Sequence, residues 1–155
     1  MATLTTTITE ALTLNGKDRG STNTLTITGI NDVYHRIVTC PASADTTIAT
    51  FRTAVTGVRS FVDLENAKYI RVTNLDGTNS VNLSLQVSVD EDGTADASAT
   101  ILIEAGKSFI MGTPHDGIVV DDDAATLVAA LGDLESLIVD PSANTVQVEI
   151  FVATT

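Results

Sequence analysis

The strongest candidate for metal chemistry is an acidic stretch at residues 90–96, which reads D-E-D-G-T-A-D. Asp90, Asp92 and Asp96 hold carboxylates close together around a glycine, and Ca²⁺ prefers several oxygen ligands of this kind. An EF-hand loop, however, requires a longer acidic spacing with glycine at its sixth position. We therefore interpret the stretch as a solvated acidic turn, with Ca²⁺ binding by Asp90, Asp92 and Asp96 as the alternative.

Residues suited to nucleophilic or zinc chemistry are scarce. The chain contains two histidines, His35 and His115, and one cysteine, Cys40, which are too few for a recurring zinc pattern. No G-x-S-x-G elbow is present, and a base beside Cys40 or a serine would depend on tertiary structure alone. Gly106-Lys107-Ser108 ends like a P-loop, but Ile101 stands where that loop needs its first glycine. The sequence therefore predicts no enzyme, no catalytic residue and no cofactor.

The composition predicts one domain with its own core. The chain has 155 residues, of which 43% are hydrophobic, and this length needs no disulfide or metal to stabilise it. Cys40 has no partner for an internal disulfide, so we expect a buried thiol in a protein that folds in a reducing compartment. No stretch approaches the roughly 20 apolar residues of a membrane helix, so we expect no membrane partner.

Acidic residues are concentrated in the second half of the chain. Residues 1–71 contain seven basic and six acidic residues, a net charge of +1, whereas residues 72–155 contain Lys107 and fourteen acids, a net charge of −13. Together they give the total of −12. A surface this acidic repels a polyphosphate, so we expect no nucleic-acid partner.

Residues 81–89 carry the clearest structural signal. They read V-N-L-S-L-Q-V-S-V, so every odd position is aliphatic and every even position is polar. Successive side chains of a strand point to opposite faces, whereas a helix would scatter these aliphatic groups around its circumference. The pattern predicts a strand with one buried face. Its five aliphatic side chains give a gross burial term of roughly 8–15 kcal/mol before chain entropy is subtracted.

The opening of the chain is rich in threonine, which favours strands over helices. Residues 3–15 alternate aliphatic residues with threonine and predict one long strand or a strand pair, and residues 22–28 repeat the pattern. Asn15-Gly16 and Arg19-Gly20 lie between these segments and tolerate positive φ, so a hairpin loop is expected there.

Short strands separated by turns predict an all-β fold, namely a β-sandwich or jelly-roll-like domain with at most one or two short helices. Residues 46–58 have mixed periodicity and are expected to hold a short helix or an irregular loop. Residues 121–131 begin with three aspartates and are expected to form a helix ended by Gly132. Asp140-Pro141 is interpreted as a turn. Further strands are expected at residues 33–40, 68–75, 99–104, 107–111, 117–120 and 145–152.

Most of the chain resembles one group of viral proteins. The resemblance lies in K-Y-I-R-V-T-N-L-D-G-T-N-S-V-N-L-S-L-Q at residues 68–86, I-L-I-E-A-G-K-S-F-I-M-G-T at 101–113 and V-Q-V-E-I-F-V-A at 146–153. The opening M-A-T-L-T-T-T-I-T-E-A-L-T-L-N-G and T-G-I-N-D-V at 28–33 are similar in style. These stretches look like the small β-rich virion structural proteins of tailed phages, particularly marine and cyanobacterial phages.

The resemblance implies a non-enzymatic virion protein that is assembled in the host cytoplasm. It implies a head decoration or cement protein bound to the major capsid protein, with a tail, neck or fibre component as the alternative. Such proteins are commonly homo-oligomeric, often trimeric. A Ca²⁺-dependent adhesion or ligand-binding sandwich stays open as a third interpretation.

Residues 1–155 are expected to form a single β domain, with an N-terminal strand or arm at residues 1–15 used in assembly. We hypothesise that this segment, with Leu4 and Ile8, is supplied to a neighbouring subunit or to a capsid protein. An edge strand has N–H and C=O groups that can pair across such an interface.

Overall fold

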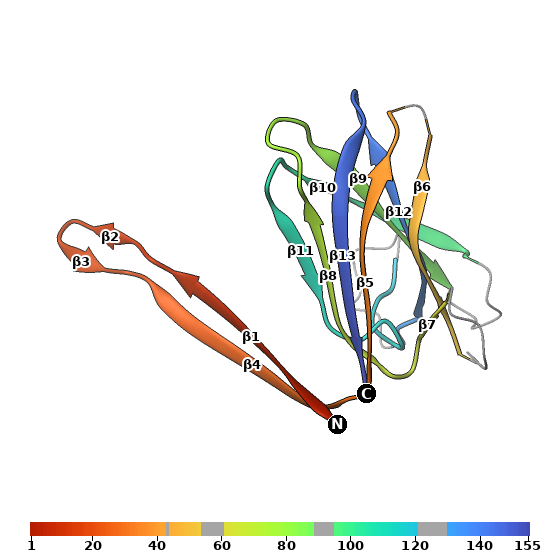
Figure 1. Ribbon diagram of the computed structural model, residues 1–155, viewed down its shortest axis with the longest axis horizontal. Coiled ribbons are helices and arrows are strands. Elements are labelled where there is room, and N and C mark those ends of the chain that lie inside the picture. The colour runs from red at the N-terminus through yellow and green to blue at the C-terminus, as the bar shows by residue number, and fades with distance from the viewer. Residues whose placement is uncertain (43, 54–60, 89–94, 121–129) are drawn as a thin grey trace.

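The structure is a computed structural model that describes residues 1–42, 44–53, 61–88, 95–120 and 130–155. Strands account for 67% of it, and no helix occurs among the described residues. Figure 1 shows a sandwich of two sheets and, projecting from one end of it, a long hairpin formed by the N-terminal segment. The predicted all-β class is therefore confirmed.

The sandwich consists of a five-stranded and a four-stranded sheet. All strand pairs are antiparallel except β6–β7, which is parallel. The five-stranded sheet has the order β10 (Ala97–Ile103), β9 (Val81–Ser88), β12 (Asp133–Pro141), β6 (Thr46–Arg52) and β7 (Val62–Asp63). The four-stranded sheet has the order β11 (Ser108–Met111), β8 (Ala67–Asn74), β13 (Val146–Thr154) and β5 (Asp32–Cys40).

The connections give this sandwich the topology of a jelly roll. Without the short β7, eight strands form two layers of four, with the orders β10-β9-β12-β6 and β11-β8-β13-β5. The chain passes to the opposite layer between every successive pair of these eight strands except β9 and β10. Two four-stranded sheets connected in this way are the double Greek key of a jelly roll, which was one of the two predicted forms.

The core lies between the inner faces of the two sheets. In β9 the odd positions are buried and the even positions are partly exposed, as predicted, up to Ser88; Val89 lies outside the described residues. β12 and β13 repeat the alternation over most of their length. The inner faces bury, among others, Val81, Leu83, Leu85, Ile70, Val72, Leu137, Val139, Val148, Ile150 and Val152. Cys40 is also fully buried, as expected.

The N-terminal hairpin, called the arm below, consists of β1 (Ala2–Glu10) paired with β4 (Ser21–Ile30). At its tip β2 (Thr13–Leu14) pairs with β3 (Lys17–Asp18). Asn15 and Gly16 connect these two short strands with φ values of 53° and 73°. Two successive positive φ values make the two-residue turn whose twist matches that of a hairpin. The predicted hairpin loop between residues 3–15 and 22–28 is confirmed. Within residues 3–15 the structure has β1 and the short β2, which pair with β4 and β3 and not with each other, and the arm extends to Ile30.

Five other predicted strands are confirmed, with their ends shifted by up to two residues, as β5, β8, β10, β11 and β13. The predicted strand at residues 117–120 is wrong. Only Ile118 forms a bridge there, with Gly132. The β-branched residues suit a strand, but a Cβ added at Gly117 would lie 2.1 Å from the carbonyl oxygen of Thr113. The chain therefore turns tightly just before Ile118.

The interpretation of residues 46–58 as a helix or irregular loop is wrong for their first half, because Thr46–Arg52 is β6. Ala49 pairs with Leu137 and Thr47 with Ile138, which leaves Ile48 between them without a partner. This bulge shifts the side-chain alternation by one residue, so Ile48 and Ala49 are both buried. The mixed periodicity is thus produced by a bulged strand. Residues 54–60 lie outside the described part.

Strand β12 was not predicted. It starts with Asp133 and Glu135, which are both buried, and buried carboxylates are uncommon unless they are paired. Its last residues, Asp140 and Pro141, pair with β9 rather than forming the predicted turn. The predicted helix at residues 121–131 lies mostly outside the described residues, and residues 130–132 are not helical.

Replacement of a core leucine tests this packing. Leu85→Ala removes a side chain that is 1% exposed between the sheets, and such a cavity costs about 2–5 kcal/mol in the free energy of unfolding. Leu102→Ala on the adjacent strand β10 is the control, because Leu102 is 59% exposed, and we expect a change within about 0.5 kcal/mol. Urea unfolding measures both. Equal losses for the two variants would contradict the assigned inner face.

Candidate functional site

The arm is a ribbon with two chemically different sides. Thr3, Thr5, Thr7 and Thr9 on β1 lie opposite Thr28, Thr26, Thr24 and Thr22 on β4. All eight are exposed and share one side, because alternate residues of a strand point the same way. Cross-strand hydroxyls approach each other, with Thr7 Oγ1 3.4 Å from Thr24 Oγ1 and Thr22 Oγ1 3.3 Å from Thr9 Oγ1. This side presents a continuous polar surface.

The opposite side of the ribbon is largely apolar. Leu4 pairs with Ile27, Thr6 with Leu25 and Ile8 with Asn23. Leu4, Ile8, Leu25 and Ile27 therefore lie on the same side, which we call the apolar side of the arm.

The root of the arm packs on the outer face of the four-stranded sheet. Leu4 and Ile27 contact a cluster that includes the buried Ile30, Tyr69 and Ala153, together with Phe151. The rings of Tyr69 and Phe151 meet edge to face, with centroids 6.1 Å apart. This contact anchors the arm by its apolar side.

A bulge lies where the arm joins the sandwich. Ala2 pairs with Ile30 and Thr3 with Thr28, so Gly29 is an unpaired extra residue. Its φ of 83° is one that residues with a Cβ rarely adopt. A bulge bends the strand that contains it, and the arm leaves the sandwich at this point (Figure 1).

Beyond its root, the apolar side is open to solvent. Ile8 is 47% exposed and Leu25 is 50% exposed. A two-stranded ribbon on its own is marginally stable in water, because it has no second layer against which to bury its apolar side. Leu4, one of the two residues predicted to form an interface, therefore contacts the chain's own sandwich, whereas Ile8 is available to a partner. Their role in an intermolecular interface stays a prediction.

The outer face of the four-stranded sheet has a second exposed group. Side chains at His35, Phe151, Arg71 and Ile110 are neighbours across its four strands. In the next row, Glu149 lies beside Ile37, which is 60% exposed. We call these six residues the outer patch.

An ion-pair network neutralises the outer patch. Glu149 Oε1 lies 2.7 Å from His35 Nε2, and Glu149 Oε2 lies 2.7 Å from Arg71 Nη1. The hydrogen bonds from His35 and then Arg71 lower the pKa of Glu149 below its ordinary value. The patch therefore combines apolar side chains with charges that balance each other.

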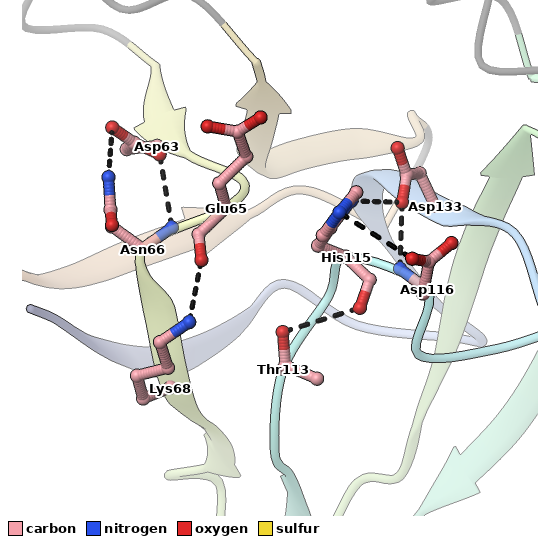
Figure 2. A network of polar contacts seen from close by, with 8 residues as sticks. All are labelled: Asp63, Glu65, Asn66, Lys68, Thr113, His115, Asp116 and Asp133. Carbon is pink, nitrogen blue, oxygen red and sulfur yellow. Dashed lines mark hydrogen bonds and ion pairs between the residues drawn. The ribbon is translucent and has the colours of Figure 1, made fainter.

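A second polar site surrounds His115, in the segment between β11 and β12 (Figure 2). Nδ1 of His115 lies 2.9 Å from Oδ1 of Asp133, and Nε2 lies 3.5 Å from Oδ2 of Asp116. The backbone N–H of Asp116 donates to the same Asp133 oxygen at 2.8 Å. Asp133 is only 1% exposed, so His115 and the Asp116 amide compensate a buried carboxylate. No sequence signal joins His115 to Asp133.

The neighbouring turn between β7 and β8 forms its own contacts. The backbone and side-chain amides of Asn66 donate to Asp63, and Lys68 Nζ donates to the carbonyl oxygen of Glu65 at 2.6 Å (Figure 2). Glu65 also acts on His115 through its charge.

The surroundings of His115 favour the protonated form of its imidazole ring. Desolvation lowers its pKa and is the largest single influence, but the hydrogen bond to Asp133 and the charges of Asp133, Asp116 and Glu65 together raise the pKa above 6.5. His115, Asp116 and Asp133 offer three possible metal-ligand atoms within 4.8 Å of one another. Both ring nitrogens already face carboxylate oxygens, however, and the doubly protonated ring satisfies both contacts.

A polar hollow of about 270 Å³ lies on the outer face of the five-stranded sheet. Carboxylates, amides and hydroxyls dominate its lining, and no aromatic ring is among them. A sugar face is usually bound against such a ring, so this hollow lacks that element. The lining residues are Asp45, Asn82, Ser84, Gln86, Thr100, Ile138 and Asp140.

The remaining sequence predictions have different outcomes. The alternative Ca²⁺ ligands Asp90 and Asp92 lie outside the described residues, and the backbone N–H of Asp96 donates to the carbonyl oxygen of Val87 at 2.9 Å. Burial raises the pKa of the Cys40 thiol, against a hydrogen bond from Thr46 that lowers it. A high pKa makes Cys40 a poor nucleophile.

Comparison with protein-family models, with curated proteins and with solved structures finds no match to this chain. Among the described residues, no helix has the length and apolar character required to cross a membrane.

The pKa of His115 tests the polar site. Because its folded-state pKa is raised, His115 stabilises the fold below about pH 6.5, and this contribution is lost as the pH rises through the folded-state pKa. NMR titration of the ring protons should give a pKa above 6.5, and Asp116→Asn should lower it. Asp63→Asn, in the neighbouring turn, is the control and should leave it unchanged. A wild-type pKa at or below 6.5 would refute the assigned contacts.

Proposed function

We propose that this chain is a non-enzymatic structural protein of a tailed-phage virion, and that it decorates the head by binding the capsid lattice. One observation carries the proposal. The arm has an apolar side that is covered at its root and half exposed at Ile8 and Leu25. A contiguous exposed apolar surface is suited to contact with another protein, and the arm carries its exposed apolar residues along one side, so we propose it as the docking element.

The sandwich supports this function as a rigid body. Its core is formed by aliphatic side chains buried between two sheets, and its charged groups join one element to another. Arg52 of β6 pairs with Glu135 of β12, and His115 pairs with Asp133. Each of these contacts compensates a buried carboxylate, which would otherwise destabilise the fold. Jelly rolls are common in viral capsid proteins, although fold alone does not determine function.

The resemblance to small virion proteins favours the head over other parts of the particle. A tail, neck or fibre component is the second candidate, because the same arm could join subunits there. The charge favours the decoration role. Residues 72–155 contain fourteen acids and one lysine, and this negative charge opposes non-specific self-association at high copy number. Major capsid protein is the proposed partner.

Copy number in purified phage particles tests the proposal. A head decoration protein should be present in proportion to the major capsid protein, whereas a tail or neck component should be present in far fewer copies. Quantitative mass spectrometry of particles from a host infected with the phage measures the ratio. Absence of the chain from purified particles would overturn both the head and the tail assignment.

The arm should control attachment to the particle. Ile8→Thr with Leu25→Thr converts the exposed apolar side to the chemistry of the threonine side, and we expect the affinity for decoration-free capsids to fall about tenfold or more. Thr5→Val with Thr26→Val changes a cross-strand pair on the opposite side and serves as the control. Co-sedimentation with capsids measures both. Undiminished binding of the Ile8→Thr, Leu25→Thr variant would contradict the role of the arm.

A further inference from the structure

We propose that the apolar side of the arm packs on the outer patch of a second copy of this chain, so that neighbouring copies are joined arm to sheet. The inference rests on the proposed assembly function and gives the arm a second copy, rather than the capsid, as its partner. Copies joined in this way bind the lattice together, so loss of the arm contact also lowers the apparent affinity for capsids. The arm-to-sheet contact follows from what the arm already contacts, from the surfaces left exposed and from their charge.

The root of the arm shows on which surface its apolar side packs. Leu4 and Ile27 pack against the buried cluster of Ile30, Tyr69 and Ala153, and Phe151 on the outer face of the four-stranded sheet packs against the same cluster. Within the described part of the chain, this sheet face is therefore the surface on which the apolar side of the arm is observed to pack. A partner that offers the same surface would extend a contact whose complementarity is already present.

The outer face of the four-stranded sheet continues beyond the root of the arm. Phe151 belongs both to the root cluster and to the row that crosses all four strands. Ile110 lies on that row at the β11 edge, and Ile37 lies one row further along β5. Ile110 and Ile37 are both exposed. The outer patch is thus continuous with the surface that anchors the arm.

The chain's own arm does not cover the outer patch. Leu25 is 50% exposed and Ile37 is 60% exposed in the same molecule, so neither covers the other. Figure 1 shows the reason, because the arm extends away from the sandwich beyond its root. Leu25 and Ile8 can reach an outer patch only on another molecule.

The charge of the chain opposes contacts between copies through charged surfaces. The chain has a net charge of −12, so two copies repel each other unless they meet through neutral surfaces. Residues 2–9 and 22–30 of the arm contain no Asp, Glu, Lys, Arg or His. In the outer patch, Glu149 is balanced by Arg71 and His35. These two surfaces avoid the repulsion that opposes other contacts between copies.

The area of the contact between arm and outer patch follows from the length of the free part of the arm. The part of the β1–β4 ribbon beyond its root, Thr6–Glu10 paired with Ser21–Leu25, presents roughly 17 by 10 Å on its apolar side. Two such contacts, counted on both surfaces, bury on the order of 700 Å², which is the size of a weak or transient interface. A reciprocal dimer has two of these contacts, and a closed ring has one per subunit.

Sedimentation equilibrium of the full chain tests the inference. The wild type should associate between about 1 μM and 1 mM, and both Leu25→Thr and Ile37→Thr should weaken this association about tenfold or more. Leu102→Thr is the control for Ile37→Thr, because Leu102 is equally exposed but lies on the five-stranded sheet. Circular dichroism checks that each variant is folded. A monomeric wild type, or an effect of Leu102→Thr equal to that of Ile37→Thr, would overturn the inference.

Disulfide trapping identifies the partner surface directly. Cys40 is buried and is the chain's only cysteine, so introduced cysteines report their own contacts. A mixture of Leu25→Cys and Ile37→Cys proteins should give a cross-linked product that contains one of each. Thr24→Cys, on the threonine side, replaces Leu25→Cys in the control and should give little product. Exclusive Leu25→Cys homodimers would show arm-to-arm packing and contradict the proposal.

The outcomes also separate this inference from the proposed function. If the chain associates through Leu25 and Ile37 but is absent from phage particles, the arm-to-sheet contact holds and the virion role fails. If the chain is present in particles but Leu25→Cys cross-links only to capsid protein, the virion role holds and the second copy is ruled out as partner.

Discussion

The structure depends on one constraint: a strand with alternating apolar and polar residues needs a second layer to cover its apolar side. The jelly roll provides this layer for its own strands, since the inner faces of the two sheets bury Leu85, Leu137 and Ile150 against each other. The arm has the same alternation but only a single layer. Its apolar side is covered at Leu4 and Ile27 and is half exposed at Ile8 and Leu25. The sandwich therefore covers its own apolar faces, whereas part of the apolar side of the arm is left uncovered, and such a ribbon is marginally stable on its own.

This division explains how the charged groups are distributed. Among the described residues of the sandwich, the buried carboxylates Glu135 and Asp133 are compensated by Arg52 and by His115, respectively. On the outer patch, Glu149 is held between His35 and Arg71, so an apolar and electrically balanced area remains on an acidic protein. The arm and this patch are two surfaces at which, in our proposal, copies of the chain approach each other without strong repulsion.

Periodicity and turn chemistry were enough to predict the all-β class, the β9 strand and the hairpin at Asn15-Gly16, because each depends on local side-chain chemistry. Three features could not be read in this way. The bulge at Ile48 breaks the alternation of β6, so that strand was not predicted. The carboxylates of Asp133 and Glu135 gave β12 a polar sequence although both are buried. Only an isolated bridge at Ile118 forms where a strand was predicted. In each case a partner distant in the sequence decides the local structure. The same holds for the candidate site: the alternation alone was enough to single out Leu4 and Ile8, whose role in an interface stays a prediction, whereas the outer patch exists only once four strands are aligned.

Hydrogen exchange of the arm amides tests the central claim most directly, namely that the arm is stabilised by a surface outside its own chain. A ribbon covered by a partner exchanges slowly, whereas an uncovered ribbon opens readily. The amides of β1 and β4 around Ile8 and Leu25 should be protected in concentrated, assembled protein and should exchange rapidly in dilute monomer, while β9 stays protected in both. Equal and strong protection of the arm in the dilute monomer would contradict the account.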